Sequence, residues 1–199
     1  MTALVIYATR EGQAKRIAEH VAASMGHRGL AVDLIDAAQI PSSFSLAGYS
    51  AAVLIASVHL GRHEPEMTSF VKFHVAELEQ IPAAFLSVSL SEAGAEDASA
   101  PAERRERAAS DVNAMIQSFL AETNWRPAKT KALAGALLYT KYNVLLRLVM
   151  KHIARQARQD TDTSRDRAYT DWAGLDDFIE EFIQHLMPRP SCLSSSPVA

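Results

Sequence analysis

The sequence predicts an α/β fold, a doubly wound parallel sheet covered by helices on both faces. Five short and nearly continuous apolar runs alternate with segments whose apolar residues recur at helical spacing. Strands that are apolar on both sides are typical of parallel sheets, because helices cover both faces of such a sheet. With 199 residues, 48% of them hydrophobic, the chain is long enough to form one domain with a sizeable core.

Five apolar runs are expected to form the sheet. Each is six to nine residues long, within the usual range for strands, and polar or turn-forming residues bound it. The run at 49–57 is apolar on both of its faces. The expected strands are residues 3–8, 30–35, 49–57, 83–90 and 130–138.

Four amphipathic segments are expected to form the covering helices. The first is followed by Gly26 and Gly29, which favour a helix end, and the last is preceded by Thr170 and Asp171, either of which suits an N-cap. The segment 36–50 lacks helical periodicity and is expected to be irregular. The expected helices are residues 14–25, 67–78, 108–120 and 172–186.

The domain organisation is expected to be simple, with residues 1–187 in one domain. Residues 139–168 interrupt the alternation of strands and helices, and a plain doubly wound domain would have a short loop there. We therefore predict an inserted segment before the last helix. Residues 188–199 are rich in proline and serine and are predicted to be a disordered tail.

Composition excludes several classes of protein. A net charge of −3 argues against a general nucleic-acid binder, and a single cysteine, Cys192, provides neither a disulfide framework nor a cysteine metal cluster. This cysteine usage favours an intracellular protein. No apolar run approaches the roughly 20 residues of a membrane span, and the N-terminus resembles a strand more than a signal peptide.

The stretch "LVIYATREGQAKR" (4–16) joins the first strand to the first helix. Free N–H groups and the dipole at a helix N-terminus attract anions, Thr9 adds a hydroxyl donor, and Gly12 allows close approach. The pattern is neither a dinucleotide fingerprint nor a Walker loop. The carboxylate of Glu11 would have to point away from a bound phosphate. On this stretch alone, an ordinary turn capped by Thr9 explains the pattern as well as a phosphate site does.

Two further loops follow expected strands, at the sheet edge where open α/β proteins bind ligands. In residues 57–66, Gly61 allows a tight turn, and His59, Leu60, Arg62 and His63 are placed to flank a planar ligand. An exposed polar loop explains these residues equally simply, and two histidines without acids or cysteines make a poor metal site. Residues 89–103 suit either a lid-like loop or a flexible surface loop.

The inserted segment contains a predicted amphipathic helix that is strongly basic on one side. Tyr142, Leu145, Leu146, Val149, Met150 and Ile153 form its apolar face, and no acidic residue occurs between Tyr139 and Asp160. A packed helix with a solvated basic side is one interpretation. Contact with an anionic ligand or membrane surface is the other. The cations concerned are Arg147, Lys151, Arg155 and Arg158.

These pieces, in this order, resemble the flavodoxin-like, quinone-dependent protoporphyrinogen IX oxidase family. The resemblance covers nearly the whole chain to about Leu186, and its late blocks are the more specific ones. It implies a flavodoxin-like sheet of five parallel strands in the order 2-1-3-4-5. The segments that carry it are "YATREGQAKRIA", "VLIASVHLGRHEPEMTSFVK", "LAETNWRPAKTKALAGALLYTKYN" and "RLVMKHIARQARQDTDTSRDRAYTDW".

The resemblance implies FMN as the cofactor, with one loop around its phosphate and two loops beside the isoalloxazine. Relatives usually have Thr or Ser at the position of Ala14, and loss of that donor to a charged acceptor costs on the order of 1 kcal/mol. The residues implied in cofactor binding are Thr9, Arg10, Glu11, Gly12, Gln13 and Ala14 in the first loop, Ser57, Val58, His59, Leu60 and Gly61 in the second, and Ser87, Val88, Ser89 and Leu90 in the third.

The resemblance also implies the reaction, in which protoporphyrinogen IX loses hydrogens to FMN and a membrane quinone, menaquinone or ubiquinone, receives the electrons. No catalytic acid or base stands out, and no metal is expected. We expect a cytoplasmic protein attached peripherally to the inner face of the plasma membrane. The four cations of the inserted segment would contact the substrate propionates or the membrane. The oligomeric state, including a homo-oligomer, stays open.

Three alternatives remain beside this interpretation. A flavodoxin-like quinone reductase or electron carrier with another donor would share the fold, although a simple carrier would not need residues 139–168. A phospho-receiver domain needs acids after the first strand and an aspartate after the third, where this chain has Thr9 and Ser57. The third alternative is a scaffold protein that has lost FMN. Ala14 supports it, because relatives usually have Thr or Ser at this position.

Overall fold

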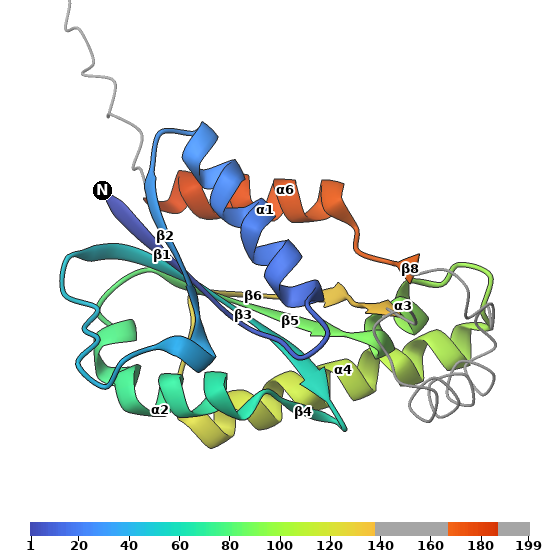
Figure 1. The fold of residues 1–199 in the computed structure, drawn as a ribbon. Helices are drawn as coiled ribbons and strands as arrows, with labels where there is room; N and C mark the ends of the chain where they lie inside the picture. Colours follow the sequence, from blue (N-terminus) through green and yellow to red (C-terminus); the bar gives the residue numbers. More distant parts are fainter. Residues whose placement is uncertain (138–166, 187–199) are drawn as a thin grey trace, which may run out of the picture.

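The computed structural model describes residues 1–137 and 167–186, and within them it has three layers (Figure 1). A central sheet lies between two pairs of helices. α1 (Gln13–His27) and α6 (Trp172–Leu186) cover one face, and α2 (Pro65–Leu78) and α4 (Ala102–Thr123) cover the other. We call these the α1/α6 layer and the α2/α4 layer. The predicted fold class is confirmed.

The sheet has five parallel strands, in the order β2-β1-β3-β5-β6. The predicted order 2-1-3-4-5 is confirmed, because β5 and β6 are the fourth and fifth of the parallel strands along the chain. The short β4 (Arg62–His63) pairs antiparallel with the end of β3 and forms a hairpin with it. The parallel strands are β1 (Thr2–Ala8), β2 (Ala31–Asp36), β3 (Tyr49–His59), β5 (Ala83–Ser89) and β6 (Lys129–Ala134).

The strands are buried to different degrees. β5 is buried at all seven positions and β3 at its seven central ones, as their apolar runs predict. β2 is not: it lies at the sheet edge, and none of its residues is fully buried. The segment after β2 has the 3-10 turn η1 (Ala37–Gln39) and no longer helix before β3, in line with its poor periodicity.

The prediction of one continuous fifth strand over residues 130–138 is wrong. β6 ends at Ala134, and after Gly135 the chain forms β7 (Ala136–Leu137), which pairs antiparallel with β8 (Arg167–Ala168). The close approach of Gly135 to β5 explains the break, since a Cβ there would lie 3.3 Å from the Ser89 carbonyl carbon. Residues 139–166 of the predicted insertion lie outside the described residues, as does the predicted tail.

The loop predicted at 89–103 is also wrong in part, because residues 90–96 form helix α3 (Leu90–Glu96). The Ser89 hydroxyl accepts a hydrogen bond from the Glu92 N–H and so caps this helix. α4 then begins at Ala102, six residues before the predicted start. At the last helix, Asp171 is the N-cap residue, since its carboxylate accepts from the Gly174 N–H at 3.0 Å.

Candidate functional site

The β1–α1 loop, residues 9–12, lies at the carboxyl end of β1. The Gly12 N–H donates to Thr9 Oγ1 at 2.9 Å, which leaves the Thr9 hydroxyl proton available to a ligand. Gly12 has a φ of 97°, a left-handed conformation that favours glycine. As the N-cap residue of α1 it has no side chain to satisfy the first N–H groups of that helix. This loop therefore has the geometry of an anion site.

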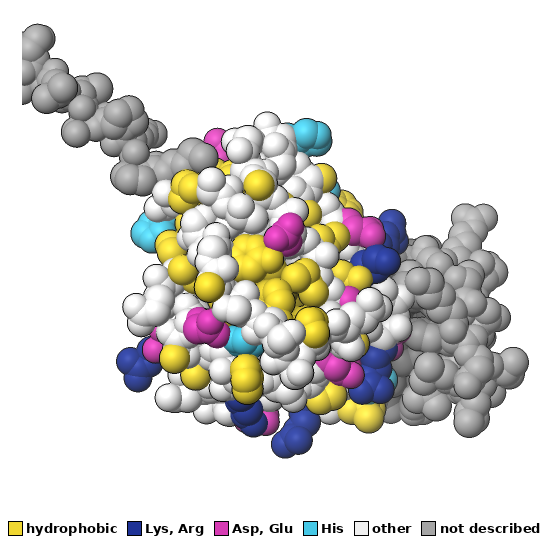
Figure 2. Space-filling model, turned by 60° about the vertical axis from the view of Figure 1, so that its left-hand side comes forward, with side chains coloured by type: hydrophobic (Ala, Val, Ile, Leu, Met, Phe, Trp, Pro, Cys, Tyr) yellow, Lys and Arg dark blue, Asp and Glu magenta, His cyan; other side chains and the backbone are white. Residues whose placement is uncertain are grey.

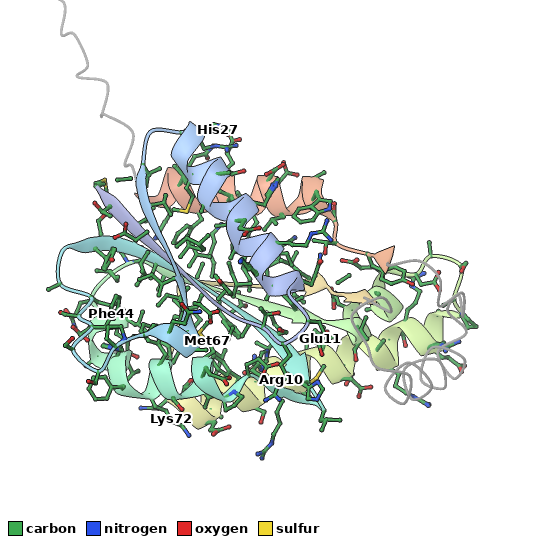
Figure 3. All side chains as sticks on the ribbon, in the orientation of Figure 1. Arg10, Glu11, His27, Phe44, Met67 and Lys72 are labelled. Atoms are coloured by element: carbon green, nitrogen blue, oxygen red, sulfur yellow. The ribbon has the colours of Figure 1, made fainter. Side chains whose placement is uncertain are left out.

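The Arg10 side chain leaves this loop and binds Glu64 (Figure 3 labels Arg10). Arg10 Nε donates to Glu64 Oε2 at 2.8 Å; the Arg10 side chain is 53% exposed, whereas that of Glu64 is 2% exposed. The guanidinium thus neutralises a buried carboxylate at the start of α2. Arg10 is available to a phosphate mainly through its backbone N–H.

The hairpin of β3 and β4 contacts the β1–α1 loop directly. The Ser57 hydroxyl donates to the Ala8 carbonyl at 3.1 Å, and His59 Nδ1 lies 3.7 Å from Glu11 Oε1. The Glu11 carboxylate is therefore drawn towards the hairpin. The two loops that the sequence predicts to share one ligand are brought together.

The tip of the hairpin is shaped by two consecutive residues of positive φ. Leu60 has a φ of 50° and Gly61 one of 78°, and the Leu60 side chain is 91% exposed. A positive φ is uncommon for a residue other than glycine, and such backbone strain is concentrated at ligand-binding sites. The tip therefore suits the apolar face of a planar ring.

On the other side of the loop, Gln13 binds a residue 157 positions away. Gln13 Nε2 donates to Thr170 Oγ1 at 2.8 Å, and the Thr170 hydroxyl donates to the Ala134 carbonyl at 2.7 Å. Ala14, which follows, is fully buried among the apolar side chains of the α1/α6 layer. Its methyl group packs in the core, so its expected contribution to a ligand is its backbone N–H.

The predicted third loop, residues 87–90, is held mostly by the protein itself. Ser87 Oγ lies 2.9 Å from His63 Nε2, Val88 packs in the α1/α6 layer, and Ser89 caps α3. Their side chains are buried, and Leu90 is partly exposed. Ligand contacts from this loop would come from Leu90 and from the backbone.

His63 is buried beside this loop, among aromatic rings of the α2/α4 layer. Its ring centroid lies 5.2 Å from that of Phe85 and 4.9 Å from that of Phe119. Burial lowers its pKa from 6.5 to about 4. At neutral pH the ring is therefore uncharged, and it supports Ser87 as a neutral hydrogen-bond partner.

A cleft of about 440 Å³ lies under the hairpin, between α2 and α4. Arg10, Arg62 and Lys72 line it together with Glu64 and Glu122. Lys72 Nζ and Glu122 Oε1 are 2.8 Å apart, so cations and carboxylates are largely balanced along its walls. The cleft adjoins two of the three loops that the sequence predicts to bind a ligand, at Arg10 and at residues 59–61.

A second cavity, of about 480 Å³, lies between η1 and α2, where Phe70 and Phe73 line it. Figure 2 shows a face on which hydrophobic side chains gather in the centre, while Lys and Arg lie nearer its margins. The residues that line the second cavity come from 37–42 and 65–74, and none belongs to the β1–α1 loop. It borders the first cleft, since Pro65 and Ser69 line both, but it does not reach the β1–α1 loop.

Two residues of this arrangement, Glu64 and Thr170, were not predicted as site residues, and His63 was expected to flank a ligand, whereas its side chain is buried. Glu64 and Thr170 fix the β1–α1 loop from its two sides, and His63 holds Ser87. Sequence patterns reveal nothing of these pairings, because the partners are 24 to 157 positions apart. Arg147, Lys151, Arg155 and Arg158 lie outside the described residues, so their predicted role is unchanged.

Comparison with known proteins identifies the type of domain. The flavodoxin domain model matches residues 4–164. Within residues 1–137 and 167–186, every helix is too short or too polar to span a lipid bilayer. A solved short-chain flavodoxin associated with a bacterial microcompartment superimposes with a TM-score of 0.54 at 14% identity, over 94% of this chain and 99% of its own.

Two curated relatives match nearly the whole chain. The protoporphyrinogen IX dehydrogenase (quinone) of Escherichia coli (strain K12) is 30% identical over 191 residues, which are 96% of this chain and 99% of the relative. The protein of the same name from Leishmania major is 29% identical over 191 residues, 94% of this chain and 78% of the relative. The matched region includes every loop of the candidate site.

Proposed function

This chain belongs to the flavodoxin-domain family and, within it, to the protoporphyrinogen IX dehydrogenases (quinone), and from this premise we propose that it uses FMN to oxidise protoporphyrinogen IX and passes the electrons to a membrane quinone. It is an oxidoreductase with a flavodoxin-like fold. The observation that carries the proposal is the match over 96% of the chain, which extends well beyond the segments that a flavin alone would need.

The residues of the β1–α1 loop fit a flavin phosphate. The uncapped start of α1 offers backbone N–H donors, the positive φ of Gly12 opens the loop, and Thr9 has a hydroxyl proton to donate. Gln13 adds a buried amide oxygen, Oε1, for which the described residues provide no donor. A ligand with phosphate oxygens and hydroxyl groups complements this set, and FMN has both.

The isoalloxazine would lie between the hairpin tip and the loop that follows β5. Leu60 offers an exposed apolar surface, and Leu90 is partly exposed at the start of α3. When bound, FMN supplies the redox chemistry, accepting hydrogen from one reactant and releasing electrons to the next. The chain's own residues bind it, orient it and exclude water from one of its faces.

Protoporphyrinogen IX is a large apolar ring with carboxylate side groups, and a quinone is dissolved in lipid. The carboxylates of the substrate favour contact with a cationic surface. A quinone in lipid requires the protein to reach the membrane, whose anionic headgroups also attract cations. Arg147, Lys151, Arg155 and Arg158 are predicted to attract the propionates, the membrane headgroups or both. We further propose a peripheral attachment to the cytoplasmic face of the plasma membrane.

The first test is the colour of the purified protein. We expect the absorption spectrum of an oxidised flavin, with FMN released on denaturation and identified by chromatography. A protein that neither carries nor binds FMN would contradict the proposal and favour a scaffold that has lost its cofactor.

The second test follows the electrons. We expect anaerobic addition of protoporphyrinogen IX to bleach the flavin, and quinone in vesicles to restore its colour. Reduction by a nicotinamide donor without any reduction by protoporphyrinogen would instead favour a quinone reductase or electron carrier.

The membrane contact is tested by charge reversal. We expect the double variant Lys151→Glu/Arg155→Glu to lose binding to anionic vesicles and to turn over protoporphyrinogen more slowly. The matched control is Arg105→Glu/Arg107→Glu, which changes the charge equally on exposed positions of α4. Equal vesicle binding and turnover in the two double variants would contradict a role for the inserted segment.

A further inference from the structure

Thr170 lies at a junction of three segments that are far apart in sequence. It follows β8 and precedes α6, its side chain is buried, and its hydroxyl donates to the Ala134 carbonyl at the end of β6 at 2.7 Å. The neighbouring Tyr169 N–H donates to the Gly135 carbonyl at 3.2 Å. Thr170 is thus fixed on the sheet before it meets the β1–α1 loop.

The polarity of the hydrogen bonds at Thr170 is determined by chemistry. A threonine hydroxyl has one proton, and a backbone carbonyl can only accept. Because the Thr170 proton goes to Ala134, the Thr170 oxygen must accept from Gln13, at 2.8 Å. The Gln13 amide therefore presents its nitrogen to Thr170, and its oxygen must face a different partner.

That other partner is missing from the described protein. Gln13 is 4% exposed, and its Oε1 is buried without a hydrogen-bond donor among the described residues. Leaving such an oxygen unpaired is costly, and buried polar atoms are rarely left so. Gln13 is the first residue of α1 and directly follows Gly12, so its side chain starts at the candidate phosphate loop.

We propose that Thr170 is a positioning residue, which orients the Gln13 amide so that Oε1 accepts a hydrogen bond from a hydroxyl of the ribityl chain of the bound flavin. The proposal rests on the proposed function, because it assumes that the site holds a flavin. An amide oxygen repels phosphate oxygens and needs a donor. The phosphate is left to the N–H groups of α1, and the sugar-alcohol chain is the part of FMN that offers hydroxyl protons.

This assignment predicts how flavins of different length respond to one substitution. In Thr170→Val the amide loses the partner that fixes its orientation. We expect the dissociation constants of FMN and of riboflavin to rise together, by about fivefold to tenfold, since one hydrogen bond to an uncharged group is lost. Thr170→Ser keeps the hydroxyl and is expected to bind both flavins as the wild type does.

The experiment measures quenching of flavin fluorescence by the flavin-free full-length protein, with FMN and with riboflavin as probes. The matched control is Thr123→Val in α4, a buried threonine whose hydroxyl also donates to a backbone carbonyl, that of Phe119. Thermal unfolding of each flavin-free variant checks the fold. Should Thr170→Val fail to fold, Gln13→Met replaces it, with the same expected weakening of both flavins.

Two results would overturn the inference while leaving the proposed function intact. One is unchanged affinity of Thr170→Val for both flavins. The other is a loss confined to FMN, which would assign the Gln13 contact to the phosphate. A wild-type protein that binds neither flavin would overturn the proposed function, and this inference with it.

Discussion

The two helical layers hold the same loop by different physical means. The α1/α6 layer is largely aliphatic around Ile17, Val21 and Leu175, and it holds the β1–α1 loop through uncharged hydrogen bonds of Gln13. The α2/α4 layer is rich in aromatic rings and contains two buried titratable side chains near the loop, His63 and Glu64. It holds the loop through an ion pair.

The difference teaches where the site is sensitive to conditions. A neutral hydrogen-bond chain depends on orientation and is indifferent to pH and salt. A buried carboxylate depends on its cation, and a buried neutral imidazole depends on staying unprotonated. We therefore expect acid and substitutions of charge to act mainly through the α2/α4 layer.

The largest effect is expected from truncating an aromatic ring in each layer. Phe85 and Phe182 are both almost completely buried, but Phe85 stacks on Phe119 at 4.4 Å, whereas Phe182 contacts no aromatic ring in the described residues. Phe85→Ala should lower the free energy of unfolding by about 4–5 kcal/mol, and Phe182→Ala by about 3–4 kcal/mol. Urea unfolding measures both. A larger loss for Phe182→Ala would contradict the greater dependence of the α2/α4 layer on ring stacking.

The next effect is the response to acid through His63. Its pKa in the folded protein, about 4, lies below the ordinary 6.5, so as the pH falls the unfolded chain binds the proton first. Stability is therefore lost as the pH falls from 6.5 towards 4, by about 2 kcal/mol at pH 5. His63→Gln removes this contribution.

Other groups also titrate in this pH range. The loss of stability in His63→Gln is therefore compared with that of the wild type in the same buffers. Burial raises the pKa of Glu92, and its protonation acts in the opposite direction. Urea unfolding at pH 7.5 and pH 5 should therefore show a smaller loss of stability in His63→Gln than in the wild type. Equal losses would exclude His63 as the acid-sensitive group.

A smaller effect separates the two members of the ion pair. Arg10→Gln leaves the buried Glu64 carboxylate without its cation, while Glu64→Gln removes the buried charge itself. Burying a paired carboxylate is close to neutral in free energy, so Glu64→Gln should change stability by less than about 1 kcal/mol. Arg10→Gln should be the more destabilising, and the double variant should recover much of the loss. Thermal unfolding measures all three, and the reverse order would contradict the interpretation of Arg10 as a counter-ion.

The sheet could be predicted because its signal is local and strong. β1, β3 and β5 are nearly continuous apolar runs, and such runs between helical patterns indicate a parallel sheet covered on both faces. The candidate site was also predicted from the sheet, since ligands of open α/β folds bind beyond the carboxyl ends of the strands. The β1–α1 loop and the hairpin do meet there, through His59 and Glu11.

Helix α3 was missed although the sequence contains its signal. Ser89 followed three positions later by Glu92 is the pattern of a capping box, and Leu90, Ala93 and Ala95 are good helix formers. Small residues let α3 pack closely on α4, where a Cβ on Gly94 would lie 3.6 Å from that of Ala108. The many alanine and glycine residues of this segment were interpreted as a sign of flexibility, but in the structure they allow α3 to pack closely on α4.

The partners that orient the loop could not be predicted by any local rule. Arg10 and Glu64 are 54 positions apart, and Gln13 and Thr170 are 157 positions apart. Each pair forms only once the sheet has brought β1, β3 and β6 into register. Thr170 looked like a helix cap, a role that Asp171 performs.

The β7–β8 pair brings together the two points between which residues 138–166 lie in the sequence. Ala136 faces Ala168 and Leu137 faces Arg167, so the chain leaves the domain and returns to it at neighbouring points. Any length of chain can be accommodated between two such points without altering strand order, and a two-residue Asn-Gly turn would suffice to close the gap. Replacing residues 138–166 by such a turn should therefore leave the order of the parallel strands unchanged.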